Sequence, residues 1–305
     1  MHCYHRDLFK VIYGYETMAD AVYRGYNAEE FERQYSARLL VPNSEELMEL
    51  AAQNSAKYRD RAGCRLDISY GATGRELLDI FPGNGKRCPV VLYTHGGYWR
   101  SRDKSYYSFL AEPLVNAGAT VVIPSYSHCP HVTLDQIVRQ LRGACAWVWN
   151  NIEEYGGDRH NFYVVGNSAG GHLTAMLAAT EWPEVIHEMP ADLIKGAMSL
   201  SGLFDLEPLL LHPINETLNM DNTMARRNSP IHLKPTLSGP YISAVGGAES
   251  DEFIHQSREF AQVWKDAGAK VEFVEAAGRD HFSIVSDMVN DDYVLWQRLR
   301  SMIGL

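Results

Sequence analysis

The segment Asn161–His172 (Asn-Phe-Tyr-Val-Val-Gly-Asn-Ser-Ala-Gly-Gly-His) constrains the fold more than any other part of the chain. It opens with a run of strand-forming apolar residues that ends at Gly166, and a helical Ala-rich pattern follows over Leu173–Thr180. Between them lies a Gly-X-Ser-X-Gly motif with Ser168 at its centre. A strand, a sharp turn and a helix in this order predict a nucleophile elbow, which presents a serine hydroxyl at a helix N-terminus. We therefore expect Ser168 to be a catalytic nucleophile.

Strand patterns alternate with helical patterns from Cys64 onward. The first two strands, Arg65–Tyr70 and Glu76–Phe81, flank the hairpin signal Gly71-Ala-Thr-Gly74. Continuous apolar strands that alternate with helices indicate a mostly parallel sheet covered on both faces. A hairpin followed by parallel strands, eight in all, predicts the α/β-hydrolase fold. The other strands are expected at Pro89–Thr94, Thr120–Ile123, Phe162–Val165, Gly196–Leu200, Tyr241–Val245 and Lys270–Val274, with helices at Leu134–Trp149 and Phe253–Ala267.

The chain is expected to divide into a helical N-terminal arm, residues 1–62, and an α/β-hydrolase domain, residues 63–305. In the arm, Phe31, Tyr35 and Leu39 have helical spacing, and Ser44 is a suitable N-cap for a second helix. The arm is too short and polar for a core of its own, so it should pack on the main domain. Four prolines interrupt the interval 203–237, which we expect to form a small cap over the sheet.

Charge and composition argue against several classes of partner. The formal net charge of −10 disfavours nucleic acid and anionic membranes, because both bind positive surfaces. No apolar run is long enough to span a bilayer, and Met1–Asp7 lacks the pattern of a secretory signal. The five cysteines are scattered without a Cys-X-X-Cys, which is typical of reduced thiols in the cytosol. We expect a cytoplasmic protein, with a homodimer left open.

A serine nucleophile needs a base, and in this fold the acid and the histidine follow the serine along the chain. His281 lies in a glycine-containing loop after the last expected strand, which makes it the predicted base. Two acids, Glu249 and Asp251, follow the seventh strand. Glu249 is favoured because its longer side chain can reach the imidazole, but Asp251 stays as the alternative. The acid that does not serve is expected to cap a helix or face solvent.

An oxyanion hole is predicted from the segment His95-Gly-Gly-Tyr-Trp99, which follows the third strand. Its glycines allow backbone N–H groups to approach a negatively charged oxygen closely. We expect the donors to be the N–H groups of Gly96 and Gly97, together with that of Ala169 after the nucleophile.

These two segments together resemble the kynurenine formamidases (arylformamidases), a branch of the hormone-sensitive-lipase-like α/β-hydrolases. The resemblance runs from about residue 30 to the last helix. It implies a serine hydrolase that converts N-formyl-L-kynurenine to L-kynurenine and formate in tryptophan breakdown, without a metal or cofactor. By position it implies Ser168 as nucleophile and His281 as base, and it places the acid, usually aspartate in the family, at Glu249. Further similar pieces are Gln34-Tyr-Ser36, Val41-Pro42, Tyr70-Gly71, Leu78-Asp-Ile-Phe-Pro82, Glu252-Phe253 and Gln256-Ser257.

The aryl ring of such a small-molecule substrate would need apolar neighbours. The candidates are the four aromatic residues Tyr98, Trp99, Tyr126 and Phe204, each of which could equally belong to the core. His172, on the helix of the elbow, is expected to be structural. The pair in His128-Cys-Pro-His131 has no further ligands nearby, so no metal site is predicted.

Two other functions remain open on the sequence. A carboxylesterase or lipase of the same fold would use the same catalytic residues. A non-catalytic binding module of this fold typically loses the nucleophile or the base, and both residue types are present here.

Overall fold

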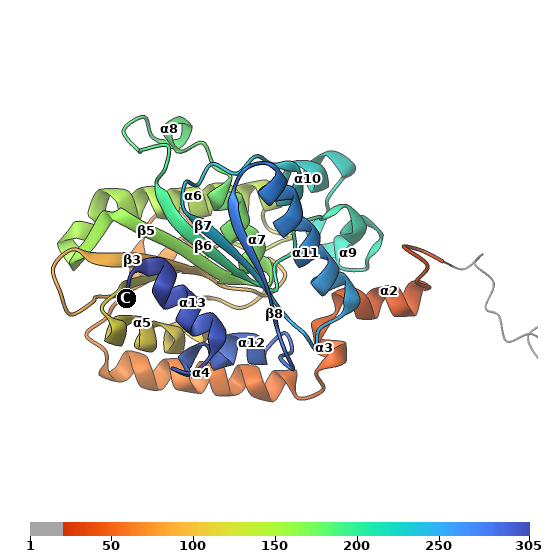
Figure 1. The fold of residues 1–305 in the computed structure, drawn as a ribbon, viewed down its shortest axis with the longest axis horizontal. Helices are drawn as coiled ribbons and strands as arrows, with labels where there is room; N and C mark the ends of the chain where they lie inside the picture. The colour runs from red at the N-terminus through yellow and green to blue at the C-terminus, as the bar shows by residue number, and fades with distance from the viewer. Residues whose placement is uncertain (1–20) are drawn as a thin grey trace, which may run out of the picture.

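A computed structural model describes residues 21–305 of the chain. The start of the expected arm, including Cys3 and the segment examined for a secretory signal, lies outside these described residues. A single twisted sheet forms the centre of the molecule, and helices cover both of its faces (Figure 1).

The sheet has eight strands in the order β1-β2-β4-β3-β5-β6-β7-β8. β2 runs antiparallel to β1 and to β4, and every other neighbouring pair is parallel. The predicted hairpin followed by parallel strands is therefore confirmed. The strands are β1 Arg65–Ser69, β2 Leu77–Phe81, β3 Cys88–Thr94, β4 Thr120–Pro124, β5 Gly157–Asn167, β6 Ile194–Leu200, β7 Pro240–Gly246 and β8 Lys270–Ala276.

Alternating side chains of the strands build two cores, one on each face of the sheet. In β3, Val90 and Leu92 belong to one core, and Val91 and Tyr93 belong to the other, as the two-residue period of a strand requires. The first core is covered by α6 Leu134–Asn151, α7 Ala169–Ala178 and α11 Asp251–Asp266 (Figure 1). The second is covered by α4 Ser44–Arg61, α5 Ala111–Ala117, α12 Ser283–Ser286 and α13 Val294–Ile303.

The segment before β1 contains three helices, α2 Ala28–Tyr35, α3 Ala37–Leu40 and α4. Phe31 and Tyr35 are buried as expected, but Leu39 is 54% exposed because α2 ends at Tyr35 and the chain bends before it. The predicted N-cap Ser44 is wrong by one position, since it is the first residue of α4 and Asn43 precedes it as the cap.

Tyr35 connects this segment to the rest of the molecule. Its hydroxyl donates to Glu252 Oε2 at 3.2 Å and accepts from Gln256 Nε2 at 3.1 Å, and both partners lie on α11. Glu252 is almost fully buried and also pairs with Arg24 at 3.4 Å. These contacts attach α2 to the helix that follows the seventh strand.

The interval 203–237 contains only short helices. It packs beside α2, where His212 Nε2 donates to the Glu32 carbonyl oxygen at 3.4 Å and the His212 ring contacts Phe31. None of the helices in residues 21–305 is both long and apolar enough to cross a membrane. The remaining short helices are η2 Lys104–Tyr106, η3 Ser108–Leu110, η4 Ile152–Tyr155, α8 Trp182–Val185, η5 Glu207–Leu211, α9 Asn215–Leu218, α10 Asn222–Arg227, η6 Pro230–His232 and η7 Asp287–Val289.

Candidate active site

Ser168 occupies the tight turn between β5 and α7. Its backbone angles are φ 55° and ψ −124°, a combination that non-glycine residues rarely adopt. The turn is held by two backbone hydrogen bonds, from Ser168 N to the Leu200 oxygen at 2.8 Å and from His172 N to the Ser168 oxygen at 3.0 Å. The strand, turn and helix expected around Ser168 are therefore present.

The two glycines of the motif are required by close packing against the end of β3. A Cβ atom at Gly166 would lie 2.1 Å from Thr94 Oγ1, and one at Gly170 would lie 2.0 Å from the Thr94 carbonyl oxygen. Thr94 Oγ1 also donates to the Gly170 oxygen at 2.7 Å, so the turn is fixed directly to β3.

Replacing Gly170 with alanine is expected to lower the free energy of unfolding by about 3 kcal/mol, because the clash is with backbone and cannot be relieved by a rotamer change. Gly143, inside α6, is the matched control, since a Cβ there meets no atom within 4 Å. Gly143→Ala is expected to raise the free energy of unfolding by up to about 1 kcal/mol. Urea denaturation measures both, and a Gly170→Ala protein as stable as wild type would contradict the packing.

His281 lies after β8, and its Nδ1 donates to Glu249 Oε2 at 2.6 Å. The Glu249 side chain is only 2% exposed. Its other oxygen, Oε1, accepts from the Gly246 N–H at 2.8 Å and from the Ser201 hydroxyl. These contacts hold the carboxylate in one orientation and fix the proton of His281 on Nδ1. The Nε2 atom is then free to accept a proton from a hydroxyl group.

Asp251 lies apart from this pair. It is the exposed first residue of α11, where its charge is favourable at the positive end of the helix. The cap of α11 is Ser250, whose Oγ accepts from the Phe253 N–H at 3.4 Å. Of the two acids that the sequence offered, the structure brings Glu249 to His281, and it shows that Asp251 is not the N-cap.

Ser168 and His281 line the same cavity, which has a volume of about 840 Å³. This size is suited to a small organic molecule. One wall comes from α3 and α4, including Met48, and another comes from the interval 203–237, including Ile214. The sequence predicted the second wall as a cap, but it gave no signal that the N-terminal helices also enclose the site.

The expected oxyanion donors differ in their availability. The Gly96 N–H donates to Asn167 Oδ1 at 3.2 Å, so it is already engaged. Gly97 lines the cavity with φ 114°, and a Cβ there would lie 2.2 Å from the Ser101 carbonyl oxygen. Ala169 begins α7, and the first N–H groups of a helix have no partner within the helix. Gly97 and Ala169 are therefore the more available of the three.

Only one of the four aromatic candidates reaches the cavity. Tyr98 lines it, and its hydroxyl donates to the Tyr35 carbonyl oxygen. Trp99, Tyr126 and Phe204 are fully buried and are not part of the lining, so the prediction that they flank a bound ring does not hold.

Each of these three has a structural partner instead. Trp99 Nε1 donates to His172 Nδ1 at 3.2 Å, and the Tyr126 hydroxyl donates to the His95 oxygen at 2.8 Å. Phe204 stacks on another phenylalanine of the core. Three further aromatic residues line the cavity, Tyr107, Phe109 and Phe282, and no motif in the sequence distinguished them.

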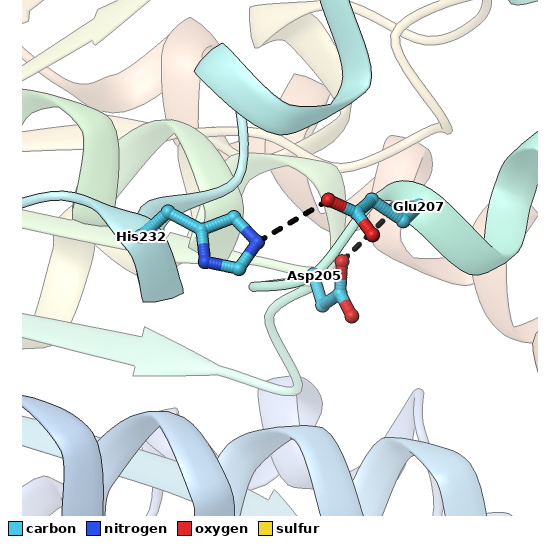
Figure 2. A group of neighbouring side chains, drawn as sticks. All are labelled: Asp205, Glu207 and His232. Atoms are coloured by element: carbon cyan, nitrogen blue, oxygen red, sulfur yellow. Dashed lines mark hydrogen bonds and ion pairs between the residues drawn. The ribbon is translucent and has the colours of Figure 1, made fainter. Parts of the chain in front are cut away.

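The two histidines of the segment His128-Cys-Pro-His131 have different surroundings. His128 Nε2 accepts from Arg75 Nη2 at 3.0 Å, and its neighbour His131 is exposed. A separate group, Asp205, Glu207 and His232, brings two carboxylates to an imidazole at the surface (Figure 2). Within it, Glu207 already pairs with Arg226 at 3.1 Å and with His232 at 3.5 Å, as in ordinary surface ion pairs.

His172 is structural, as expected. It is fully buried, and its Nε2 donates to the Asn228 carbonyl oxygen at 2.7 Å while Nδ1 accepts from Trp99. Burial lowers the pKa of His172 from 6.5 to about 4, and burial likewise lowers the pKa of His95 to about 3. Both rings therefore stay neutral in the folded protein at pH values where the unfolded chain binds protons.

The protein is accordingly expected to lose stability as the pH falls through the window from 6.5 toward 4. Each of the two buried histidines should remove about 1 kcal/mol between pH 7.5 and 5.5. Urea denaturation of the wild type and of His172→Gln at these two pH values measures the effect. The variant should show the smaller dependence on pH, and an equal dependence would contradict the assignment to His172.

Comparisons with known proteins identify relatives of this chain. A family model described as BD-FAE matches residues 78–205. A kynurenine formamidase from Danio rerio is 34% identical over 92% of this chain and 98% of its own length. Esterase LipQ from Mycobacterium tuberculosis is 30% identical over 73% of this chain but only 58% of its own length. A solved structure described as a candidate thioesterase from a Silicibacter species has a TM-score of 0.80 at 28% identity and covers 90% of this chain and 99% of its own.

Proposed function

The chain belongs to the kynurenine formamidase family of α/β-hydrolases, and on this premise we propose that it hydrolyses N-formyl-L-kynurenine to L-kynurenine and formate. The observation that carries the proposal is the 2.6 Å hydrogen bond between His281 and the buried Glu249, beside the cavity that Ser168 also lines. A serine nucleophile needs a histidine base that a carboxylate orients, and the His281–Glu249 pair supports that role.

In the first half of the reaction, the Ser168 oxygen attacks the formyl carbon and His281 Nε2 accepts the hydroxyl proton. The carbonyl oxygen becomes negatively charged and accepts hydrogen bonds from the N–H groups of Gly97 and Ala169. One such donor typically contributes a factor of about 10²–10³ in rate. Glu249 stabilises the imidazolium that forms.

In the second half, His281 returns the proton to the aniline nitrogen, and the C–N bond breaks. The amine leaves readily because the aryl ring delocalises its lone pair. L-Kynurenine departs and a formyl ester remains on Ser168. Water then attacks this ester with His281 as base, which releases formate and restores the hydroxyl.

We also propose that the enzyme is located in the cytosol. The four cysteines in residues 21–305 are all free, and three of them are buried. Free thiols are usual in a reducing environment. This supports a cytosolic enzyme.

The test compares kcat/KM for N-formyl-L-kynurenine with kcat/KM for p-nitrophenyl acetate. We expect L-kynurenine to form and the formamide to be the better substrate. The alternative function is a carboxylesterase, which the LipQ match favours because an esterase would use the same residues. Ester hydrolysis without any L-kynurenine would exclude the formamidase and support the esterase.

A further inference from the structure

Five arginine and glutamate side chains contribute to the lining of the cavity. Three are guanidinium groups, which is notable in a chain with a net charge of −10. Arg102 differs from the others because its side chain is only 11% exposed. The others, Glu32, Arg38, Arg100 and Glu216, are exposed. Of the five charged side chains that line the cavity, only that of Arg102 is therefore shielded from solvent.

The backbone fixes Arg102 in place. Its φ of 72° is unusual for a residue with a side chain, and such strain persists only where the surroundings hold it. The Arg102 carbonyl oxygen accepts from Arg75 Nη2 at 3.0 Å, and the next residue, Asp103, accepts from the Ser105 N–H at 2.8 Å. Arg102 also belongs to the loop that carries Gly97. The loop proposed to supply an oxyanion donor thus also positions a cation that is largely shielded from solvent.

The guanidinium of Arg102 retains unused hydrogen-bonding capacity. Its carboxylate partner among the described residues is Glu45, whose two oxygens lie 3.3 and 3.4 Å from Nη2. A well-formed guanidinium–carboxylate bond is about 2.7–2.9 Å long. Glu45 is also 62% exposed, so the pair is weakened by solvent. The remaining face of the guanidinium packs on the Tyr106 ring at 5.0 Å. A second carboxylate could therefore bind Arg102 more closely than Glu45 does.

We propose that Arg102 binds the α-carboxylate of the substrate's amino-acid end, so that the enzyme selects formamides that carry a carboxylate. This inference rests on the proposed function. A guanidinium can hold a carboxylate through two parallel hydrogen bonds, which gives orientation as well as affinity. Loss of such a charged contact typically weakens binding roughly 10- to 10²-fold.

The first test compares two formamides in wild type and variants. One is N-formyl-L-kynurenine, and the other is 2′-formamidoacetophenone, which keeps the ring and the formamide but lacks the amino-acid group. Arg102→Gln should lower the ratio of their kcat/KM values, with the carboxylate substrate in the numerator, roughly 10- to 10²-fold. Arg102→Lys should restore part of the ratio, because the charge remains while the paired hydrogen bonds are lost.

Arg100→Gln is the matched control, since Arg100 also lines the cavity but is exposed. It should leave the ratio within about twofold, because exposed charges contribute little. A ratio that Arg102→Gln leaves unchanged would overturn the proposal. This includes the case in which both rates fall together, because a purely structural role of Arg102 would have that effect.

A second measurement separates this proposal from the proposed function. L-Kynurenine and 2′-aminoacetophenone are tested as inhibitors of p-nitrophenyl acetate hydrolysis. Arg102→Gln should raise the inhibition constant of L-kynurenine relative to that of the ketone by the same factor. If this shift occurs in an enzyme that cleaves no formamide, the carboxylate site stands and the formamidase fails. If formamides are cleaved and neither ratio depends on Arg102, only the carboxylate site fails.

Discussion

Replacing Ser168 with alanine is expected to lower kcat for N-formyl-L-kynurenine by about 10⁶, because the attacking oxygen is removed and no covalent intermediate can form. The rate of L-kynurenine formation measures the loss. The alanine should fold, since the turn is held by the backbone bonds to Leu200 and His172. Some acceleration over water should remain from the oxyanion donors and from substrate binding.

Ser238→Ala is the control for this variant, because Ser238 is an exposed serine outside the cavity lining. It should keep kcat within about twofold, as surface substitutions usually have small effects. A Ser168→Ala enzyme that retains a tenth of the wild-type rate would show that another group attacks the formyl carbon.

Glu249→Gln is expected to lower kcat by about 10⁴, the typical result of neutralising the acid that orients a catalytic histidine. The amide keeps the size of the side chain but cannot stabilise the imidazolium. It can also present an N–H donor to His281 and so favour the wrong tautomer. The pH-independent kcat of the variant is the quantity to measure, together with its free energy of unfolding.

Asp251→Asn is the matched control, since Asp251 is the other candidate acid after β7 and is exposed at the start of α11. It should change kcat by less than about threefold, with at most a small loss of stability from the weaker charge at the start of α11. The reverse ranking of the two variants would assign the acid to Asp251.

Much of the fold could be predicted because its signals are local. Apolar runs located all eight strands, and the glycine spacing around Ser168 located the turn. The errors were at the ends of elements. β5 begins at Gly157, five residues before the expected Phe162, because its first residues are largely polar and carry no strand signal.

The choice between Glu249 and Asp251 could not be made from sequence alone. Both follow the same strand, and they lie two positions apart, on either side of Ser250. Because the Ser250 side chain caps α11, the helix begins at Asp251 and turns that side chain towards solvent. Glu249 stays in the loop that faces His281. The position of the α11 cap at Ser250 therefore decides which of the two acids can bond to His281.

The shape of the cavity depends on contacts between distant parts of the chain. The Tyr98 hydroxyl reaches the Tyr35 carbonyl oxygen, and Trp99 turns into the core towards His172. Tyr98 therefore lines the cavity while its neighbour Trp99 lies in the core. Both residues have positive φ values in a tight loop. Hydrophobic patterns do not report backbone angles of this kind. The burial of Trp99 and the position of Arg102 could therefore be read only from the structure.

The reactivity of Ser168 is tested most directly by peptide mapping after reaction with a fluorophosphonate probe, which labels activated serines. We expect one adduct, on Ser168, that forms more slowly in Glu249→Gln and in the presence of L-kynurenine. A wild-type protein that stays unlabelled while it hydrolyses N-formyl-L-kynurenine, or an adduct on a different residue, would contradict the role of Ser168 as the nucleophile.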